Sequence, residues 1–309
     1  MTGWLETIST FLLAGTGVAF FGYLLVRDAE LLSDKLGLGR FLIGFLLLSV
    51  VTSLPEMTVA ALSSAAGVVD ISVGDILGSN IVNIALVVSL STIFITRLIA
   101  VQTKLLKDLA GILYFSSAIP IILVFIPQAS VEIGIILILS FLIYIYLTFK
   151  ESAEVQSQKM DVKTGYPLIL LMALAGASGT IYSATHLVEA AKRVVELAGI
   201  SELEVGAKFV ALSTSAPELA TVLTSAKRHE YEMALGNAVG SNLTNVTLIL
   251  GALLTISGSI ITFQQHISTV LFVLLVTLTF WFFVSRGRLT KMAGLILLAL
   301  YSAFLIYGR

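Results

Sequence analysis

The sequence contains no cysteine, only three histidines and only 12% charged residues. Without cysteine the chain can form neither a disulfide nor a thiolate metal site. The histidines lie near the ends of the apolar runs, so we assign them no role. A soluble domain carries about 25% charged residues, and the low value here excludes an ordinary soluble protein. The net charge of −1 provides no field that would recruit nucleic acid.

The patterns of an enzyme are also missing. The sequence shows no nucleophile–base pair and no phosphate loop, and its glycine-rich segments do not stand between a strand and a helix. We therefore expect no enzymatic activity and no cofactor.

Long apolar runs dominate what is present. The chain is 57% hydrophobic, and the runs 7–26, 76–96 and 109–131 carry no charge. Each run is long enough to cross about 30 Å of hydrocarbon as a helix, and continuous runs argue against a barrel. We expect an all-α integral membrane protein with ten transmembrane helices, at about 4–26, 40–66, 72–96, 105–126, 130–149, 164–188, 203–226, 232–259, 266–285 and 290–307.

Basic residues predict the orientation. The loops after odd-numbered spans hold fourteen lysines and arginines, whereas those after even-numbered spans, with the C-terminus, hold three. The positive-inside rule then places both termini outside a multi-pass cell-membrane protein. The polar segment 151–163 is the expected cytoplasmic linker between a first half, 1–150, and a second half, 164–309.

Two stretches repeat at a constant offset of 162 residues. Residues 52–83 contain TSLPE and then GDILGSNIVN, and residues 214–245 contain TSAPE and then GNAVGSNLTN. Five spans per half is an odd number, so the second half must enter the membrane upside down. Inverted repeats of this kind are typical of transporters, which bind their substrate where the repeats meet.

Glu56 and Glu218 give the strongest functional signal. A carboxylate at mid-membrane depth is costly and by default marks an ion path. The alternative is a protonated glutamate that hydrogen-bonds a neighbouring helix. Pro55 and Pro217 lack an amide hydrogen, which predicts a bent helix with freed carbonyl oxygens on Val51 and Ser213 and leaves a plain kink as the alternative.

Neutral oxygen donors surround the two glutamates in sequence. They are Thr52, Ser53, Ser79 and Asn83 in the first copy, and Thr214, Ser215, Ser241 and Asn245 in the second. Hydrogen bonding between helices is the competing interpretation for the asparagines, and it weighs equally for Asn80 and Asn242. Carboxylates and neutral oxygens without sulfur or imidazole suit hard cations, so calcium and sodium are the best candidates.

The paired motifs resemble the α-repeats of the sodium/calcium exchanger family, prokaryotic type, within the cation/calcium exchanger superfamily. The resemblance covers nearly the whole chain and implies antiport of calcium against sodium. It also implies that Glu56 and Glu218 are shared central ligands, and that adjacent sites are completed by Thr52, Thr214, Ser53, Ser215, Ser79, Ser241, Asn83 and Asn245.

The chain departs from the family pattern at several positions. Val51 and Ser213 stand where glycine is usual, and Asp75 stands where the second copy has Asn237. Asp75 is either a third acid at the site or a helix cap facing water. Lys208 lies in the seventh expected span, where its ammonium either enters the ion path, extends to a membrane interface or pairs with a nearby carboxylate.

The expected mechanism is alternating access. An empty site with two unpaired carboxylates should resist crossing, whereas one calcium or several sodium ions neutralise it. The first and sixth spans carry no motif and are rich in small residues, so they are the expected moving part. A proton-coupled calcium or cation antiporter is the alternative, and a passive cation channel is a further rival. The expected partners are these ions and the lipid bilayer, with no nucleic acid, and a monomer is the simplest state.

Overall fold

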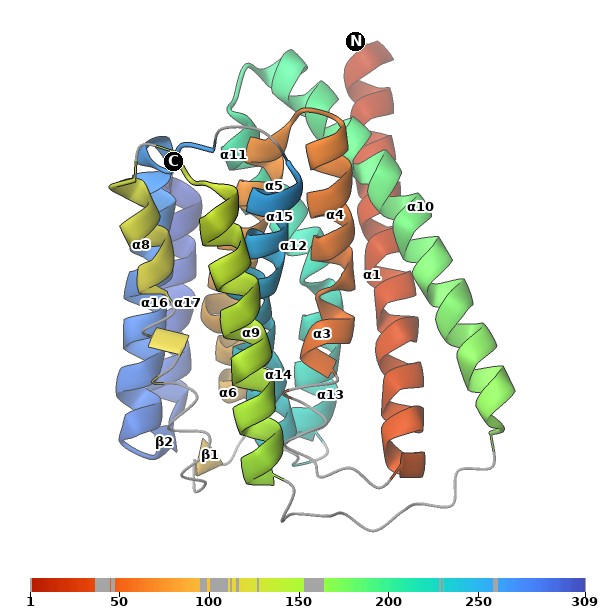
Figure 1. The fold of residues 1–309 in the computed structure, drawn as a ribbon, viewed down its shortest axis with the longest axis vertical. Helices are drawn as coiled ribbons and strands as arrows, with labels where there is room; N and C mark the ends of the chain where they lie inside the picture. Colours follow the sequence, from red (N-terminus) through yellow and green to blue (C-terminus); the bar gives the residue numbers. More distant parts are fainter. Residues whose placement is uncertain are drawn as a thin grey trace.

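A computed structural model gives the fold of the chain as a bundle of helices (Figure 1). It describes residues 2–36, 48–94, 99–100, 117–126, 128–152, 164–227, 231–257 and 261–308, with single positions at 45, 111, 113, 114 and 229. The start of the second expected span, the first residues of the fourth and linker residues 153–163 lie outside these ranges.

The helices of the first half follow the expected spans. They are α1 (Thr2–Leu36), α3 (Ser49–Thr52), α4 (Leu54–Ala65), α5 (Val69–Ile81), the π-helix η2 (Val82–Val88), α6 (Ser89–Phe94), α8 (Ala118–Val124) and α9 (Val131–Ser152). A strand, β1 (Ile99–Ala100), lies between α6 and α8.

Like the first half, the second half begins with a long helix. Its helices are α10 (Tyr166–Ala198), α11 (Glu202–Val205), the π-helix η3 (Gly206–Val210), α12 (Ala211–Thr214), α13 (Ala216–Lys227), α14 (Tyr231–Thr244), the π-helix η4 (Asn245–Ile249), α15 (Leu250–Ile256), the 3₁₀-helix η5 (Gln264–His266), α16 (Ile267–Ser285) and α17 (Lys291–Tyr307). The strand β2 (Arg288–Leu289) pairs antiparallel with β1, a contact between the halves that the sequence did not predict.

Local sequence explains several helix ends. α10 stops at Gly199, which adopts a left-handed conformation with φ 65°, as glycine commonly does after a helix. Ser201 then caps α11, because its hydroxyl accepts a hydrogen bond from the Glu204 amide at 3.2 Å. Thr290 caps α17 in the same way by accepting from the Ala293 amide.

Within the described residues, five helices are long and apolar enough to cross a membrane: Gly3–Leu24, Val69–Ile93, Tyr166–Ala198, Met233–Ile256 and Gln264–Ser285. Val131–Leu147 and Lys291–Tyr307 are shorter apolar helices. The helical membrane class predicted from the sequence therefore agrees with the structure.

The two motif segments form the centre of the bundle. Val69–Ile93 and Met233–Ile256 are mostly buried, whereas Gly3–Leu24 and Tyr166–Ala198 leave most of their apolar surface uncovered. Helices with exposed apolar faces suit contact with lipid, and buried ones must contact protein. The residues of the repeated motifs are thus kept away from both lipid and water.

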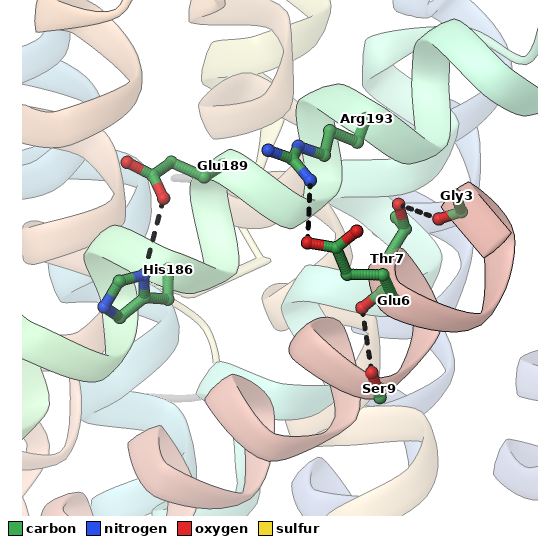
Figure 2. A network of polar contacts seen from close by, with 7 residues as sticks. All are labelled: Gly3, Glu6, Thr7, Ser9, His186, Glu189 and Arg193. Carbon is green, nitrogen blue, oxygen red and sulfur yellow. Dashed lines mark hydrogen bonds and ion pairs between the residues drawn. The ribbon is translucent and has the colours of Figure 1, made fainter.

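α1 and α10 pack along each other at one side of the bundle (Figure 1). Small residues permit the close approach: a Cβ at Gly17 would lie 3.0 Å from the Ser183 Cβ. Near the start of α1, Arg193 of α10 forms an ion pair with Glu6 at 3.7 Å (Figure 2). Both side chains are exposed, so this ion pair contributes little to stability.

Candidate cation-binding site

Each TS-x-PE motif breaks its helix at a serine. Ser53 separates α3 from α4 with φ −82° and ψ 6°, and Ser215 separates α12 from α13 with φ −78° and ψ 4°. Pro55 and Pro217 therefore lie in the first turn of a new helix, where a missing amide hydrogen is tolerated. The sequence predicted bent helices at these places, and the structure has broken ones.

The freed carbonyl oxygens lie one residue later than the sequence predicted. At each break, cap amides donate to the carbonyl oxygens of Val51 and Ser213, so these oxygens are not free. Within the described residues no backbone amide reaches the carbonyl oxygens of Thr52 and Thr214. These two oxygens are the ones left for a cation.

The carboxylates of Glu56 and Glu218 are completely buried. None of their four oxygens has a hydrogen-bond partner in the part of the chain that the structure describes. A glutamate that merely joined two helices would have such a partner, so this geometry disfavours the structural alternative. A buried charge without a partner costs several kcal/mol, and a bound cation removes that cost.

Contacts between the threonines and serines join the two halves at the site. The Thr52 hydroxyl lies 3.0 Å from the Ser241 hydroxyl, and the Thr214 hydroxyl lies 3.4 Å from the Ser79 hydroxyl. The two contacts are equivalent under the 162-residue offset. Each half of the site is therefore completed by residues from the other half.

Asp75 and Asn237 occupy equivalent places beside these contacts. Thr214 donates to the Asp75 carboxylate at 2.9 Å, and Thr52 donates to the Asn237 amide oxygen at 3.3 Å. Asp75 is fully buried in the middle of α5. The interpretation of Asp75 as a helix cap facing water is therefore wrong.

Four asparagines form a second connection between the halves. Asn80 and Asn242 each donate to the backbone carbonyl of the other, at 3.4 and 2.9 Å. Their side-chain oxygens accept from Asn245 and Asn83 respectively, both at 3.1 Å. The amide oxygens of Asn83 and Asn245 remain buried without a partner among the described residues. Asn80 and Asn242 thus hydrogen-bond between helices. By accepting from the amide nitrogens of Asn245 and Asn83, they leave the side-chain oxygens of those two residues without a partner among the described residues.

π-helices begin at or beside these asparagines. Asn83 lies in η2, and Asn245 is the first residue of η4. A π-helical turn leaves backbone and side-chain groups out of the regular pattern and is frequent at functional sites. No sequence pattern predicted these turns.

Backbone contacts hold the central helices together at glycines. A Cβ at Gly78 of α5 would lie 2.6 Å from the Ala207 Cα of η3. Its counterpart Gly240 in α14 would meet the Phe45 carbonyl and the Ser49 Cβ, both at 2.7 Å. These approaches bring the serines that follow each glycine to the threonines of the other half.

All ten residues expected as cation ligands are buried, and each lies in or beside these connections. The hydroxyls of Ser53 and Ser215 have no partner among the described residues. No three acidic or histidine side chains of the described residues converge on one metal position, so a cation here would depend on neutral oxygens as well. The ligand roles themselves stay predictions.

Lys208 lies in η3 and forms an ion pair with Glu204 at 3.2 Å. Both side chains are partly exposed. The geometry therefore favours pairing with a nearby carboxylate over a position in the ion path.

The hydrogen bonds among the four asparagines can be tested by removing the Asn242 side-chain oxygen, which accepts from the Asn83 amide nitrogen. We expect Asn242→Ala to raise the calcium concentration for half-maximal uptake about fivefold, because one hydrogen bond contributes about 1 kcal/mol. Calcium uptake into proteoliposomes measures this, with Ser140→Ala, a change at an exposed hydroxyl of α9, as the control. An unchanged half-maximal concentration would show that Asn242 does not orient Asn83.

Comparison with known proteins identifies a family. The family model described as "Sodium/calcium exchanger protein" matches residues 7–150 and 168–308. The sodium/calcium exchanger MaX1 of Methanosarcina acetivorans is 25% identical, over 91% of this chain and 92% of that protein. The uncharacterized membrane protein MJ0091 of Methanocaldococcus jannaschii is 28% identical, over 94% of this chain and 96% of that protein.

Solved structures give the same result. The sodium-calcium exchanger NCX_Mj, soaked with Na⁺ and Sr²⁺, superposes with a TM-score of 0.72 at 26% identity, covering 99% of both chains. A second structure of that exchanger, soaked with Na⁺ and Ca²⁺, superposes with a TM-score of 0.72 over 98% of this chain and 99% of that one. The likeness extends over the entire bundle.

Proposed function

Because this chain belongs to the sodium/calcium exchanger family, we propose that it exchanges calcium for sodium at the buried oxygen site between its two halves. It is a sodium/calcium antiporter and not an enzyme. The position of the cation site is supported by two equivalent, fully buried glutamates whose carboxylate oxygens have no hydrogen-bond partner among the described residues. The transported calcium and sodium ions are substrates, and no cofactor is expected.

Calcium lies between Glu56 and Glu218 in this proposal, with the carbonyl oxygens of Thr52 and Thr214 beside it. Sodium ions occupy the same region and share the hydroxyls and amides of Ser53, Ser215, Ser79, Ser241, Asn83 and Asn245. Divalent and monovalent ions then compete for the same two carboxylates. Competition for shared ligands is the basis of exchange, since the two ions cannot fill the site together.

The chain spans the cell membrane ten times as two inverted five-helix halves, 1–150 and 164–309, joined by a cytoplasmic linker. Figure 1 supports an even number of spans, because α1 begins and α17 ends toward the same end of the bundle. The excess of basic residues in loops after odd-numbered spans favours an extracellular position for both termini. One chain supplies both halves of the site, so a monomer suffices.

α1 and α10 move together as the gate. Gly22 of α1 lies directly against Pro217, and a Cβ there would also lie 3.6 Å from the Pro55 Cγ. α1 thus covers the two prolines that precede the glutamates. Sliding of this helix would uncover one end of the site and close the other, which is alternating access between repeats around a fixed site.

Calcium flux in proteoliposomes tests the exchange. An outward sodium gradient should drive calcium uptake against its own gradient, whereas a pH gradient in sodium-free buffer should not. Uptake driven by protons alone would favour the proton-coupled alternative. Ion currents in a planar bilayer without any counter-ion would favour a channel.

A further inference from the structure

We propose that Ser63 and Ser225 are transient cation ligands on the two routes into the central site, Ser63 on the extracellular route and Ser225 on the cytoplasmic one. The two serines stand at equivalent places in the repeat, at the same offset of 162 residues as the motifs. Because exchange requires calcium and sodium to reach the glutamates from both sides, this inference rests on the proposed function.

Each serine lies on the same helical face as a central glutamate. Ser63 follows Glu56 by seven residues in α4. Ser225 follows Glu218 by the same interval in α13. This interval is about two helical turns, so each hydroxyl stands about 10 Å along the helix from its glutamate. α4 runs toward the end of the bundle where α1 begins and α13 toward the opposite end, which places the serines on opposite sides of the site (Figure 1).

The hydroxyls of Ser63 and Ser225 are buried and unpaired. Both side chains are completely buried, and neither oxygen has a hydrogen-bond partner among the described residues. Other hydroxyls of the same helices are paired, since Thr58 in α4 and Thr221 in α13 each donate to the carbonyl oxygen four residues back, at 2.8 Å. A buried hydroxyl without a partner is unfavourable, and the serines at the two helix breaks share this condition. Ser63 and Ser225 thus resemble the expected ligands and differ from the hydroxyls bonded within their helices.

The helical face that carries Glu56 and Ser63 is covered by the proposed gate. Val59 lies between these two residues on that face. It belongs to a buried apolar cluster that also contains Ala14 of α1 and Leu187 of α10. α10 packs against α4, and α1 packs against α13. Each serine therefore has one helix of the gate beside its own helix, so a sliding movement can open one route while the other stays closed.

A hydroxyl at this depth suits the passage of a hard cation. Calcium and sodium must exchange bound water for protein oxygens before they reach the carboxylates, and neutral oxygens are ligands for such ions. A hydroxyl about two turns before the glutamate replaces one water while the ion keeps the others. A single neutral oxygen holds the ion weakly and passes it on. Each serine therefore serves entry from its own side of the membrane.

The absence of cysteine from the chain permits a direct test of the two routes. We expect Ser63→Cys to react with a membrane-impermeant thiol reagent in right-side-out membrane vesicles only, and Ser225→Cys in everted vesicles only. Ser117→Cys is the control and should stay unreactive, because Ser117 is equally buried but its hydroxyl is bonded to the Leu113 carbonyl and to Thr277. Labelling of both serine variants from the same side, or of neither, would overturn the proposal.

Alanine at each position tests the ligand role. We expect Ser63→Ala to raise the half-maximal calcium concentration for sodium-driven uptake about fivefold in right-side-out vesicles and to leave it unchanged in everted ones. Ser225→Ala should show the reverse. Neither change should lower the melting temperature, because the hydroxyl that is removed has no partner among the described residues.

Thr58→Ala is the matched control, since its hydroxyl is bonded within α4, and it should behave as the wild type on both sides. A serine variant that changes uptake equally from both sides, or from neither, would overturn the proposal while leaving sodium-driven exchange intact. Failure of the proposed function would be seen separately, as a wild type without sodium-driven uptake in either kind of vesicle, and would refute both.

Discussion

Glu56→Gln and Glu218→Gln each reduce sodium-driven calcium uptake by at least about 100-fold. Glutamine keeps the shape of the side chain and removes its charge, so calcium loses one of the two carboxylates that balance it. Removing one partner of a buried ionic group costs about 3–5 kcal/mol, and every 1.4 kcal/mol is a factor of ten in binding. The two variants should be similar, because both side chains are fully buried at equivalent places in the repeat.

Initial rates of radioactive calcium uptake into sodium-loaded proteoliposomes measure this effect. Glu132→Gln is the matched control, since Glu132 is an exposed residue in the first turn of α9. The control should transport at the wild-type rate. Uptake above a tenth of the wild-type rate in either buried variant would mean that its carboxylate is not a calcium ligand.

Gly78→Ala should abolish exchange and lower the melting temperature of the purified protein. The added Cβ would lie 2.6 Å from the Ala207 Cα and would also meet the Ala207 carbonyl. Both atoms belong to backbone, which cannot rotate away as a side chain can. The overlap must therefore push α5 from η3, at a cost of about 1–3 kcal/mol or more.

Gly78→Ala should lose exchange even at temperatures where the purified protein is still folded. Displacing α5 moves Ser79 and Asp75 away from Thr214, the contact that completes one half of the site. Gly165→Ala is the control, because the nearest atom to its Cβ would be the Pro167 Cδ at an ordinary 3.6 Å. A Gly78→Ala protein with normal exchange would show that the close approach of these helices does not position the site.

Much of this architecture could be predicted from the sequence because the duplication repeats it. A carboxylate after a proline is weak evidence for an ion site when it occurs once and strong evidence when both copies have it. The helical spans were predicted separately, from apolar runs without charge. The membrane class and the family were confirmed by the fold and the comparisons. The ligand set, the domain boundaries and the orientation stay predictions.

The details that escaped prediction depend on contacts between distant residues. The partners of Asn80 and Asn242 are 162 residues away, and no local pattern separates an asparagine that binds a helix from one that faces an ion. A missing proline amide alone would free the carbonyl oxygens of Val51 and Ser213. Because the helices break at Ser53 and Ser215, the free carbonyl oxygens are those of the next residues, Thr52 and Thr214. The π-helices at Asn83 and Asn245 likewise depend on packing between the halves, which overrides local propensity.

Anomalous X-ray scattering from crystals grown with strontium, a heavier divalent cation, tests the central claim most directly. A strontium peak should lie between the carboxylates of Glu56 and Glu218, and it should weaken as sodium replaces strontium in the crystal. A strontium peak away from both carboxylates, or one that sodium leaves unchanged, would contradict exchange at this site.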